Sequence, residues 1–193
     1  MKLFKATLFV AAAALFSFAT ADLFTYNVDG AHSRLGFTIK HMGVSDFNGQ
    51  FDKFETKFTA TKADFSDAKV EFTADAASIN TYIDKRDEHL RSEDFLNTAK
   101  YPEITFKSTS FKKAKGNNYD LEGDFTFHGV TKKIKLNAEL VGSVENPQSK
   151  KTVTGFKVTG VIKRSDYGIA TGFPVQMLGD DINVTANLEL VKE

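Results

Sequence analysis

The chain has 193 residues, with 25 Lys and Arg against 25 Asp and Glu, four His and no Cys. This length fits one ordinary domain, and the balanced charge argues against a nucleic-acid-binding protein, which usually carries a basic excess. The absence of Cys excludes disulfides, thiolate nucleophiles and zinc–thiolate or iron–sulfur sites. The aromatic residues are 19 Phe and 5 Tyr with no Trp, and hydrophobic residues make up 41% of the chain, enough to build a core.

Residues 1–21 have the three parts of a secretory signal peptide in order. Lys2 and Lys5 give a positive start, residues 8–18 are apolar, and an A-x-A site ends at Ala21. A membrane anchor is the alternative, but the apolar run is shorter than the roughly 18–20 residues that span a bilayer. We therefore expect cleavage after Ala21 and a mature domain of residues 22–193 without a transmembrane segment, with 23 basic and 25 acidic residues.

Apolar and polar residues alternate with a period of two through most of the mature sequence, which predicts half-buried strands. In chain order the expected strands lie near residues 34–41, 49–59, 69–79, 104–110, 119–127, 132–140, 156–162 and 182–190.

One expected strand breaks the alternation, because Phe47 and Phe51 have the opposite parity to Phe54 and Phe58. Either Phe54 faces outward or a β-bulge near residues 52–53 resets the pleat. We favour the bulge, because a strongly bent barrel strand commonly needs one.

The connections are predicted from turn residues and from loss of the alternation. Residues 115–118 and His128-Gly129 predict tight turns, and residues 145–150 predict a longer loop. The charge-dense residues 84–97 suit short helical turns, with Ser92 as a candidate N-cap and a few apolar anchors. Residues 172–179 begin near Pro174, end in Gly and suit one short helix.

Eight strands with few helices predict an all-β single domain. A sandwich and a closed barrel both satisfy this pattern. An eight-stranded barrel is wide enough either to be filled by side chains or to hold one small ligand.

Residues with catalytic or metal-binding chemistry are sparse. The four histidines, His32, His41, His89 and His128, form no close pair with metal-ligand spacing, so no metal site is predicted. The sequence has no G-x-S-x-G, P-loop or G-x-G-x-x-G motif. We assign no catalytic residue and expect no cofactor.

Two polar clusters interrupt the pattern, at residues 86–91 and 164–168. In one interpretation their arginines form a polar mouth that hydrogen-bonds the head group of a ligand. In the other, Arg–Asp pairs attach the irregular connections to the end of the barrel, and spacing alone favours this second interpretation.

The Phe residues share one face of the expected strands. This set comprises Phe37, Phe58, Phe72, Phe106, Phe125 and Phe156. Together they predict either a dense core or an apolar tunnel that would prefer hydrocarbon, because Phe has no polar handle.

Several of these stretches resemble the YceI family of exported lipid-binding proteins. They are residues 29–41 (DGAHSRLGFTIKH), 49–51, 78–95 (SINTYIDKRDEHLRSEDF), 101–108 (YPEITFKS), 123–132 (GDFTFHGVTK), 164–168 (RSDYG) and 178–180. The match runs over nearly the whole mature chain in the same order. Leu96 departs from it, since an aromatic residue is common there.

The resemblance implies an extended eight-stranded antiparallel lipocalin-like barrel with one or two short helical segments. It implies a periplasmic carrier, not an enzyme, that holds a polyisoprenoid, isoprenoid quinone or fatty amide, and it implies a homodimer. Carried over to this chain, Arg86, Asp87, His89, Arg164 and Asp166 would frame the entrance. The complete set of expected ligand-binding residues adds Phe37, Ile39, His41, Phe58, Phe72, Phe106, Phe125, Phe156, Val158, Ile162, Met177 and Ile182.

Two other functions remain open from the residues alone. The first is an enzyme acting on such a lipid with His41 or His89 as acid or base, which requires a histidine inside the pocket with a hydrogen-bond partner. The second is a ligand-free, stress-related interaction protein, which requires a filled interior.

Overall fold

The structure is a computed structural model that describes residues 22–193, so the expected signal peptide lies outside the described residues. The strands are β1 (Phe24–Val28), β2 (Arg34–His41), β3 (Ser45–Phe51), β4 (Phe54–Ala60), β5 (Lys69–Asp75), β6 (Ile79–Asn80), β7 (Glu103–Lys113), β8 (Asn118–Phe127), β9 (Val130–Glu145), β10 (Thr152–Lys163) and β11 (Leu178–Lys192). Within this part of the chain there is one α-helix, α1 (Asp84–Arg91), and two short 3₁₀ helices, η1 (Ala76–Ser78) and η2 (Arg164–Tyr167). Among the described helices, none has the length and apolar character needed to cross a membrane.

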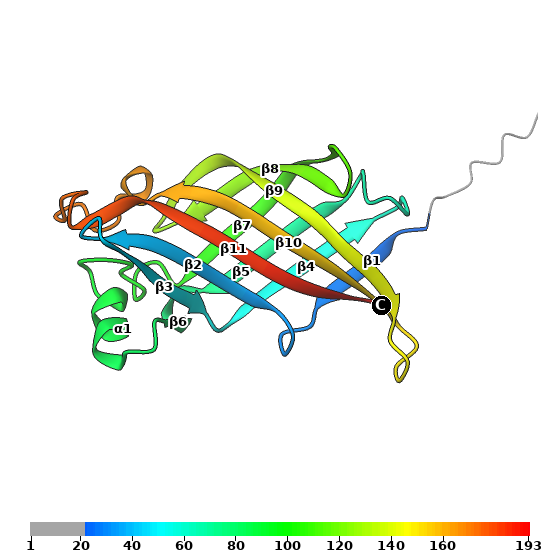
Figure 1. Ribbon diagram of the computed structural model, residues 1–193, viewed down its shortest axis with the longest axis horizontal. Coiled ribbons are helices and arrows are strands. Elements are labelled where there is room, and N and C mark those ends of the chain that lie inside the picture. Colours follow the sequence, from blue (N-terminus) through cyan, green and yellow to red (C-terminus); the bar gives the residue numbers. More distant parts are fainter. Residues whose placement is uncertain (1–21) are drawn as a thin grey trace, which may run out of the picture.

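The strands form a closed antiparallel barrel, elongated along its axis (Figure 1). The ring runs β1–β4–β5–β7–β8–β9–β10–β11 and closes where β1 pairs with the end of β11, with Tyr26 opposite Lys192. The eight-stranded barrel implied by the family resemblance is therefore confirmed, and it decides between the sandwich and the barrel that the alternation left open. Its strand β1 was not among the eight strands expected from the alternation.

Near the start of β11, a different strand forms the adjoining part of the sheet. There β2 takes the place of β1 beside β11, and β3 and β6 follow β2 in the sheet. In the described residues β6 has no pairing with β7, and α1 with the turns up to residue 102 occupies that side. The Arg91 guanidinium fastens this segment to the sheet by donating to the carbonyls of Ala77 and Ile79, at 2.7 and 3.0 Å.

The parity change at residues 47–58 is a break between two strands. β3 ends at Phe51 and β4 begins at Phe54, and the two pair with different neighbours. The sequence thus located the irregularity correctly, but it is a break between two strands and not a β-bulge. Phe54 is partly buried against both hydrophobic clusters of the interior, so the outward-facing alternative is wrong.

The connections differ from the sequence prediction at two points. Ser92 follows the last turn of α1 and its hydroxyl donates to the carbonyl of His89 at 2.7 Å, so it caps the C-terminus of the helix and not an N-terminus. Residues 172–179 form turns and the start of β11, not a helix. The carbonyl of Pro174 closes a turn by accepting from the backbone N–H groups of Met177 and Leu178, while the carbonyls of Phe173 and Leu178 accept from the buried Arg164 guanidinium. The His128-Gly129 turn is confirmed, with φ of 50° and 75°.

One end of the barrel is filled by an aromatic plug. It consists of Tyr26, Phe58, Phe65, Phe111, Tyr119 and Phe156, all buried. Phe65 comes from the β4–β5 connection and closes the end, with its ring centroid 5.6 Å from that of Phe58 and 5.7 Å from that of Phe156. The Tyr119 hydroxyl donates to the carbonyl of Asp64 at 2.7 Å, which holds this connection in place. The dense interior expected from the Phe content therefore fills only this end.

Candidate ligand cavity

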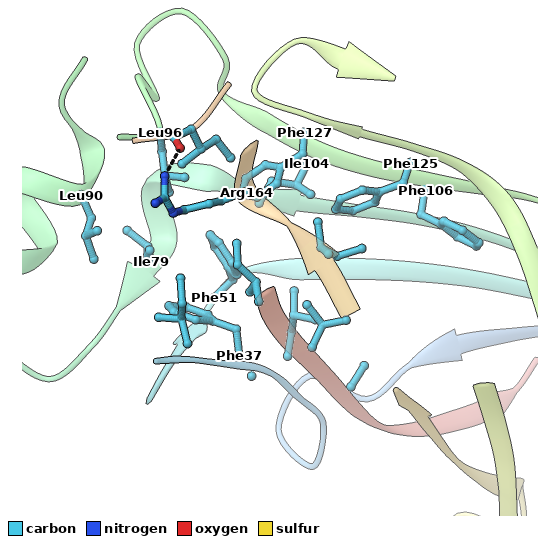
Figure 2. A pocket seen from close by; sticks show the side chains of 18 of the residues that line it. Phe37, Phe51, Ile79, Leu90, Leu96, Ile104, Phe106, Phe125, Phe127 and Arg164 are labelled. Atoms are coloured by element: carbon cyan, nitrogen blue, oxygen red, sulfur yellow. Dashed lines mark hydrogen bonds between the residues drawn. The ribbon is translucent and has the colours of Figure 1, made fainter. Parts of the chain in front are cut away.

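A cavity of about 410 Å³ occupies the interior beyond the aromatic plug. Figure 2 shows side chains from several strands converging on it, including Phe37, Phe51, Phe106 and Phe125. This volume lies in the range of about 300–1,000 Å³ that is usual for small-molecule sites. The filled interior required by a ligand-free barrel is therefore not what the structure has. We call the open end of this cavity, next to α1 and residues 168–177, the mouth.

Strand alternation decides which side chains enter the barrel, and position along the strand decides whether they reach the cavity or the plug. On β10, Ile162 and Val158 line the cavity, and the next large inward side chain, Phe156, belongs to the plug. On β4, Thr56 lines the cavity and Phe58 belongs to the plug. Phe58 and Phe156 were expected among the lining residues, and this placement is corrected: both lie beyond the floor of the cavity.

The structure brings most of the other expected residues to the cavity wall. Those that line it are Phe37, Ile39, His41, Phe72, Arg86, His89, Phe106, Phe125, Val158, Ile162, Arg164, Met177 and Ile182. Whether they contact a ligand stays a prediction.

Two carboxylates of the expected entrance do not line the cavity. Asp87 is buried and accepts hydrogen bonds from the backbone N–H and the hydroxyl of Thr81. Asp166 is exposed on the outside and pairs with Lys132, with Nζ 2.6 Å from Oδ1. Asp87 therefore holds the start of α1, and Asp166 belongs to a surface ion pair.

Arg164 lies at the mouth with its hydrogen-bonding capacity fully used. It is 3% exposed, and its guanidinium donates to the carbonyls of Ile169, Ala170, Phe173, Leu178 and Gly179, at 2.7–3.2 Å. A guanidinium has five N–H donors, so none is left for a ligand. The interpretation in which arginines attach the connections is correct for Arg164, although the acceptors are carbonyls and not Asp side chains.

Arg86 differs from Arg164 because part of its guanidinium is uncommitted. Its Nε and Nη2 donate to the hydroxyl and carbonyl of Thr81 at 2.8 and 2.7 Å, and its Cζ lies 4.0 Å from the ring centroid of Phe47. Among the described residues, its Nη1 has no hydrogen-bond acceptor. Arg86 is half-buried and lines the cavity, so it can present a charged donor to a polar group at the mouth.

Both histidines of the enzyme alternative lie at the mouth. His41 is exposed at the end of β2. His89 on α1 places Nε2 3.2 Å from Oδ2 of Asp94, and its ring packs edge-on against Phe95, with centroids 4.9 Å apart. His89 lines the cavity at its mouth, but its partner Asp94 does not, and both side chains are exposed. The histidine–carboxylate pair of the enzyme alternative is therefore at the rim of the cavity and not inside it.

The sequence interpretation missed part of the wall that irregular segments contribute. Leu90, Phe95 and Leu96 come from the charge-dense stretch, and Phe173 comes from the connection before β11. Phe95 and Phe173 meet at the mouth with ring centroids 5.0 Å apart. The sequence marks Leu90, Phe95 and Leu96 as the apolar anchors of their stretch, but no local pattern indicates that they face a cavity.

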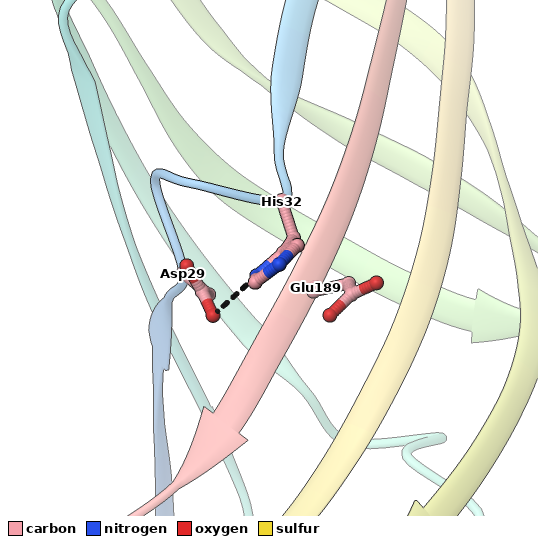
Figure 3. A group of neighbouring side chains, drawn as sticks. All are labelled: Asp29, His32 and Glu189. Atoms are coloured by element: carbon pink, nitrogen blue, oxygen red, sulfur yellow. Dashed lines mark hydrogen bonds and ion pairs between the residues drawn. The ribbon is translucent and has the colours of Figure 1, made fainter.

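A separate polar group fastens the outside of the barrel. Figure 3 shows His32 and Asp29 of the β1–β2 turn beside Glu189 of β11, with His32 Nδ1 2.9 Å from Asp29 Oδ2. The hydrogen bond to Asp29, with the charges of Asp29 and Glu189, raises the pKa of His32, and the same hydrogen bond lowers the pKa of Asp29. The backbone N–H of Glu189 donates to the hydroxyl of buried Ser33 at 2.9 Å. This group locks the turn onto β11 where β1 gives way to β2.

Comparison with known proteins identifies the family of this barrel. The family model of the YceI-like domain matches residues 26–190. The chain belongs to the YceI-like family. Protein YceI of Escherichia coli O17:K52:H18 is 42% identical over 162 residues, covering 83% of this chain and 84% of the relative.

Solved structures agree with this family. A YceI protein from Campylobacter jejuni is 34% identical with a TM-score of 0.72, covering 86% of this chain and 96% of that one. A polyisoprenoid binding domain from Saccharophagus degradans has the same fold with 20% identity and a TM-score of 0.62, covering 87% of this chain and 98% of that one. The same barrel fold is thus found in proteins with quite different sequences.

Proposed function

We propose that this protein is a periplasmic carrier that holds a long-chain apolar lipid inside its barrel. The observation that carries the proposal is the cavity of about 410 Å³, walled mainly by Phe, Leu, Ile and Val and open at one end. Polyisoprenoids, isoprenoid quinones and fatty amides are the ligand classes with a matching chain. The fold relative from Saccharophagus degradans, described as a polyisoprenoid binding domain, supports this choice.

Burial of the chain supplies the binding energy. Each buried CH₂ contributes about 0.8 kcal/mol, so a chain of roughly 15–20 carbons gains several kcal/mol after ordering costs. Arg86 is the side chain best placed to donate to a head group at the mouth, because Arg164 has no free N–H.

The test begins with mass spectrometry of an organic extract of the natively purified protein, followed by uptake of added isoprenoid quinone. We expect a long-chain lipid in the extract and saturable uptake by the emptied protein. Recovery of no lipid together with no uptake would refute the proposal.

A matched pair of variants assigns uptake to the cavity. Val158→Trp fills the cavity with an apolar ring and should abolish uptake while the barrel stays folded. Lys157→Trp adds the same ring at the adjacent, exposed position of β10 and should bind normally. Equal uptake by the two variants would place binding elsewhere.

The enzyme alternative is tested by the same preparations. In a carrier, the added lipid should be recovered chemically unchanged from both the unmodified protein and the His89→Gln variant. Chemical conversion of the added lipid that disappears in this variant would favour the enzyme instead.

Periplasmic location and a homodimer complete the proposal. Export rests on residues 1–21 and is checked by the mass of the mature N-terminus, expected at Asp22 in a periplasmic extract. The homodimer rests on the family resemblance and is checked by sedimentation velocity.

A further inference from the structure

Four exposed apolar side chains lie together on two neighbouring tips at the mouth. Met42 and Val44 lie in the β2–β3 turn, 58% and 84% exposed, and Val175 and Met177 lie in the connection before β11, 56% and 52% exposed. The two tips touch, because the backbone N–H of Met42 donates to the carbonyl of Met177 at 2.8 Å. We call these four side chains the apolar rim.

The tips that carry the rim have no charged residue. Residues 42–45 read MGVS and residues 172–177 read GFPVQM. Behind the first tip, the charge of Lys40 is matched by Asp46, with Nζ 2.8 Å from Oδ1. These two tips are therefore neutral as well as apolar, which fits the surface of an uncharged phospholipid better than a charged partner.

The rim is continuous with the cavity. Met177 is exposed and also lines the cavity, and so does His41, the neighbour of Met42. In Figure 1 the β2–β3 turn, the connection before β11 and α1 all lie at the same end of the barrel, opposite the end with the plug. An apolar chain leaving the cavity there would meet the rim before it met water.

We infer that the apolar rim is a membrane-docking surface that inserts into the interface of a phospholipid bilayer while the lipid enters or leaves the barrel. This inference rests on the proposed function, because it explains how a water-insoluble ligand reaches the cavity. Shallow insertion of four apolar side chains gives reversible attachment, as expected for an interfacial contact of small area.

The experiment compares the purified protein with two double variants of equal chemistry. Val44→Asp with Val175→Asp changes the rim. Val141→Asp with Val144→Asp changes two valines of β9 that are 68% and 66% exposed and lie towards the other end of the barrel. Each protein is mixed with phosphatidylcholine vesicles, and the bound fraction is measured by flotation, together with the rate at which vesicle quinone enters the protein.

The rim variant should lose at least about tenfold in vesicle partition and in the rate of loading from vesicles, because two charges replace valines that would insert into the bilayer interface. The β9 variant should match the unmodified protein. Both variants should take up quinone from detergent micelles to the same final level, since the cavity is unchanged.

Three results would overturn the inference. The first is equal vesicle binding by both variants, or none by the unmodified protein. The second is a rim variant that also fails to load from micelles. The third is a rim variant that turns a dimer into a monomer with vesicle binding unchanged, since a second copy would then cover the rim. Failure of the unmodified protein to load from micelles would instead refute the carrier function itself.

Discussion

One buried side chain, Arg164, attaches the irregular segment at the mouth to the barrel. Its five N–H groups all donate to main-chain carbonyls, so Arg164→Met leaves several buried acceptors unpaired. We expect a loss of about 3–5 kcal/mol in the free energy of unfolding, measured by urea denaturation. Arg34→Met is the control, because exposed Arg34 makes one hydrogen bond, to the carbonyl of Ser33, and should change stability by less than about 1 kcal/mol. Equal losses would contradict the anchoring role.

Arg86 should act on the ligand more than on stability. Arg86→Met keeps an apolar stem over Phe47 but removes the free N–H at the mouth. We expect an isoprenoid quinone, whose carbonyls accept hydrogen bonds, to bind roughly tenfold more weakly, since a hydrogen bond to a charged group contributes about 1.5–3 kcal/mol. A plain hydrocarbon of equal length should bind unchanged. Titration calorimetry with both ligands makes the comparison, and a parallel loss for the hydrocarbon would argue against a head-group contact.

His32 predicts a pH-dependent contribution to stability. Its folded-state pKa is raised, mainly by the hydrogen bond to Asp29. The contribution is therefore fully present below the unfolded pKa of about 6.5 and is lost as the pH rises through the folded-state value. His32→Gln should lower the melting temperature more at pH 6 than at pH 9. NMR titration of the His32 ring checks the cause, and an unshifted pKa would contradict it.

At the scale of elements, the floor of the cavity is set by where β10 passes from Val158 to Phe156. Phe156→Ala removes a ring from the plug directly behind the floor and should cost about 3–5 kcal/mol. It should also extend the cavity and raise the affinity for chains longer than those that the unmodified protein prefers. A series of ligands of increasing length measures this shift. An unchanged length preference would show that the floor lies elsewhere.

The strands and the turns between them were largely predictable from the sequence. Alternation gave the inward face of β5, β7, β8, β10 and β11 because one face of each is apolar, and the His128-Gly129 turn followed from its residue types. Alternation carries no information on depth along the barrel axis, which is why Phe156 was grouped with Val158. The connection at residues 172–179 was misjudged for another reason: the carbonyls of Phe173, Leu178 and Gly179 accept from Arg164, a contact that no local pattern reveals.

At the scale of the whole molecule, the barrel is a packed half joined to a hollow half. A ligand that fills the hollow half should stabilise the entire domain, because unfolding must release it. At a free concentration of about 100 times Kd the gain is about 2.7 kcal/mol, which raises the melting temperature of a domain of this size by roughly 5–11 °C. Differential scanning calorimetry with and without quinone measures the shift. Val158→Trp should show no shift, and a shift in that variant would contradict cavity binding.

The way in which Arg164 holds the mouth has a consequence for how such barrels diverge. All five acceptors are main-chain carbonyls, and every amino acid supplies one. The exposed side chains of the connection between η2 and β11, such as Val175, are therefore free to change without loosening this attachment, whereas Ile169 and Ala170 are buried in the core. Substitutions at exposed positions of this one segment can therefore change ligand preference at the mouth while the barrel stays intact. In this way the Arg164 anchor lets ligand selectivity evolve without loss of fold stability.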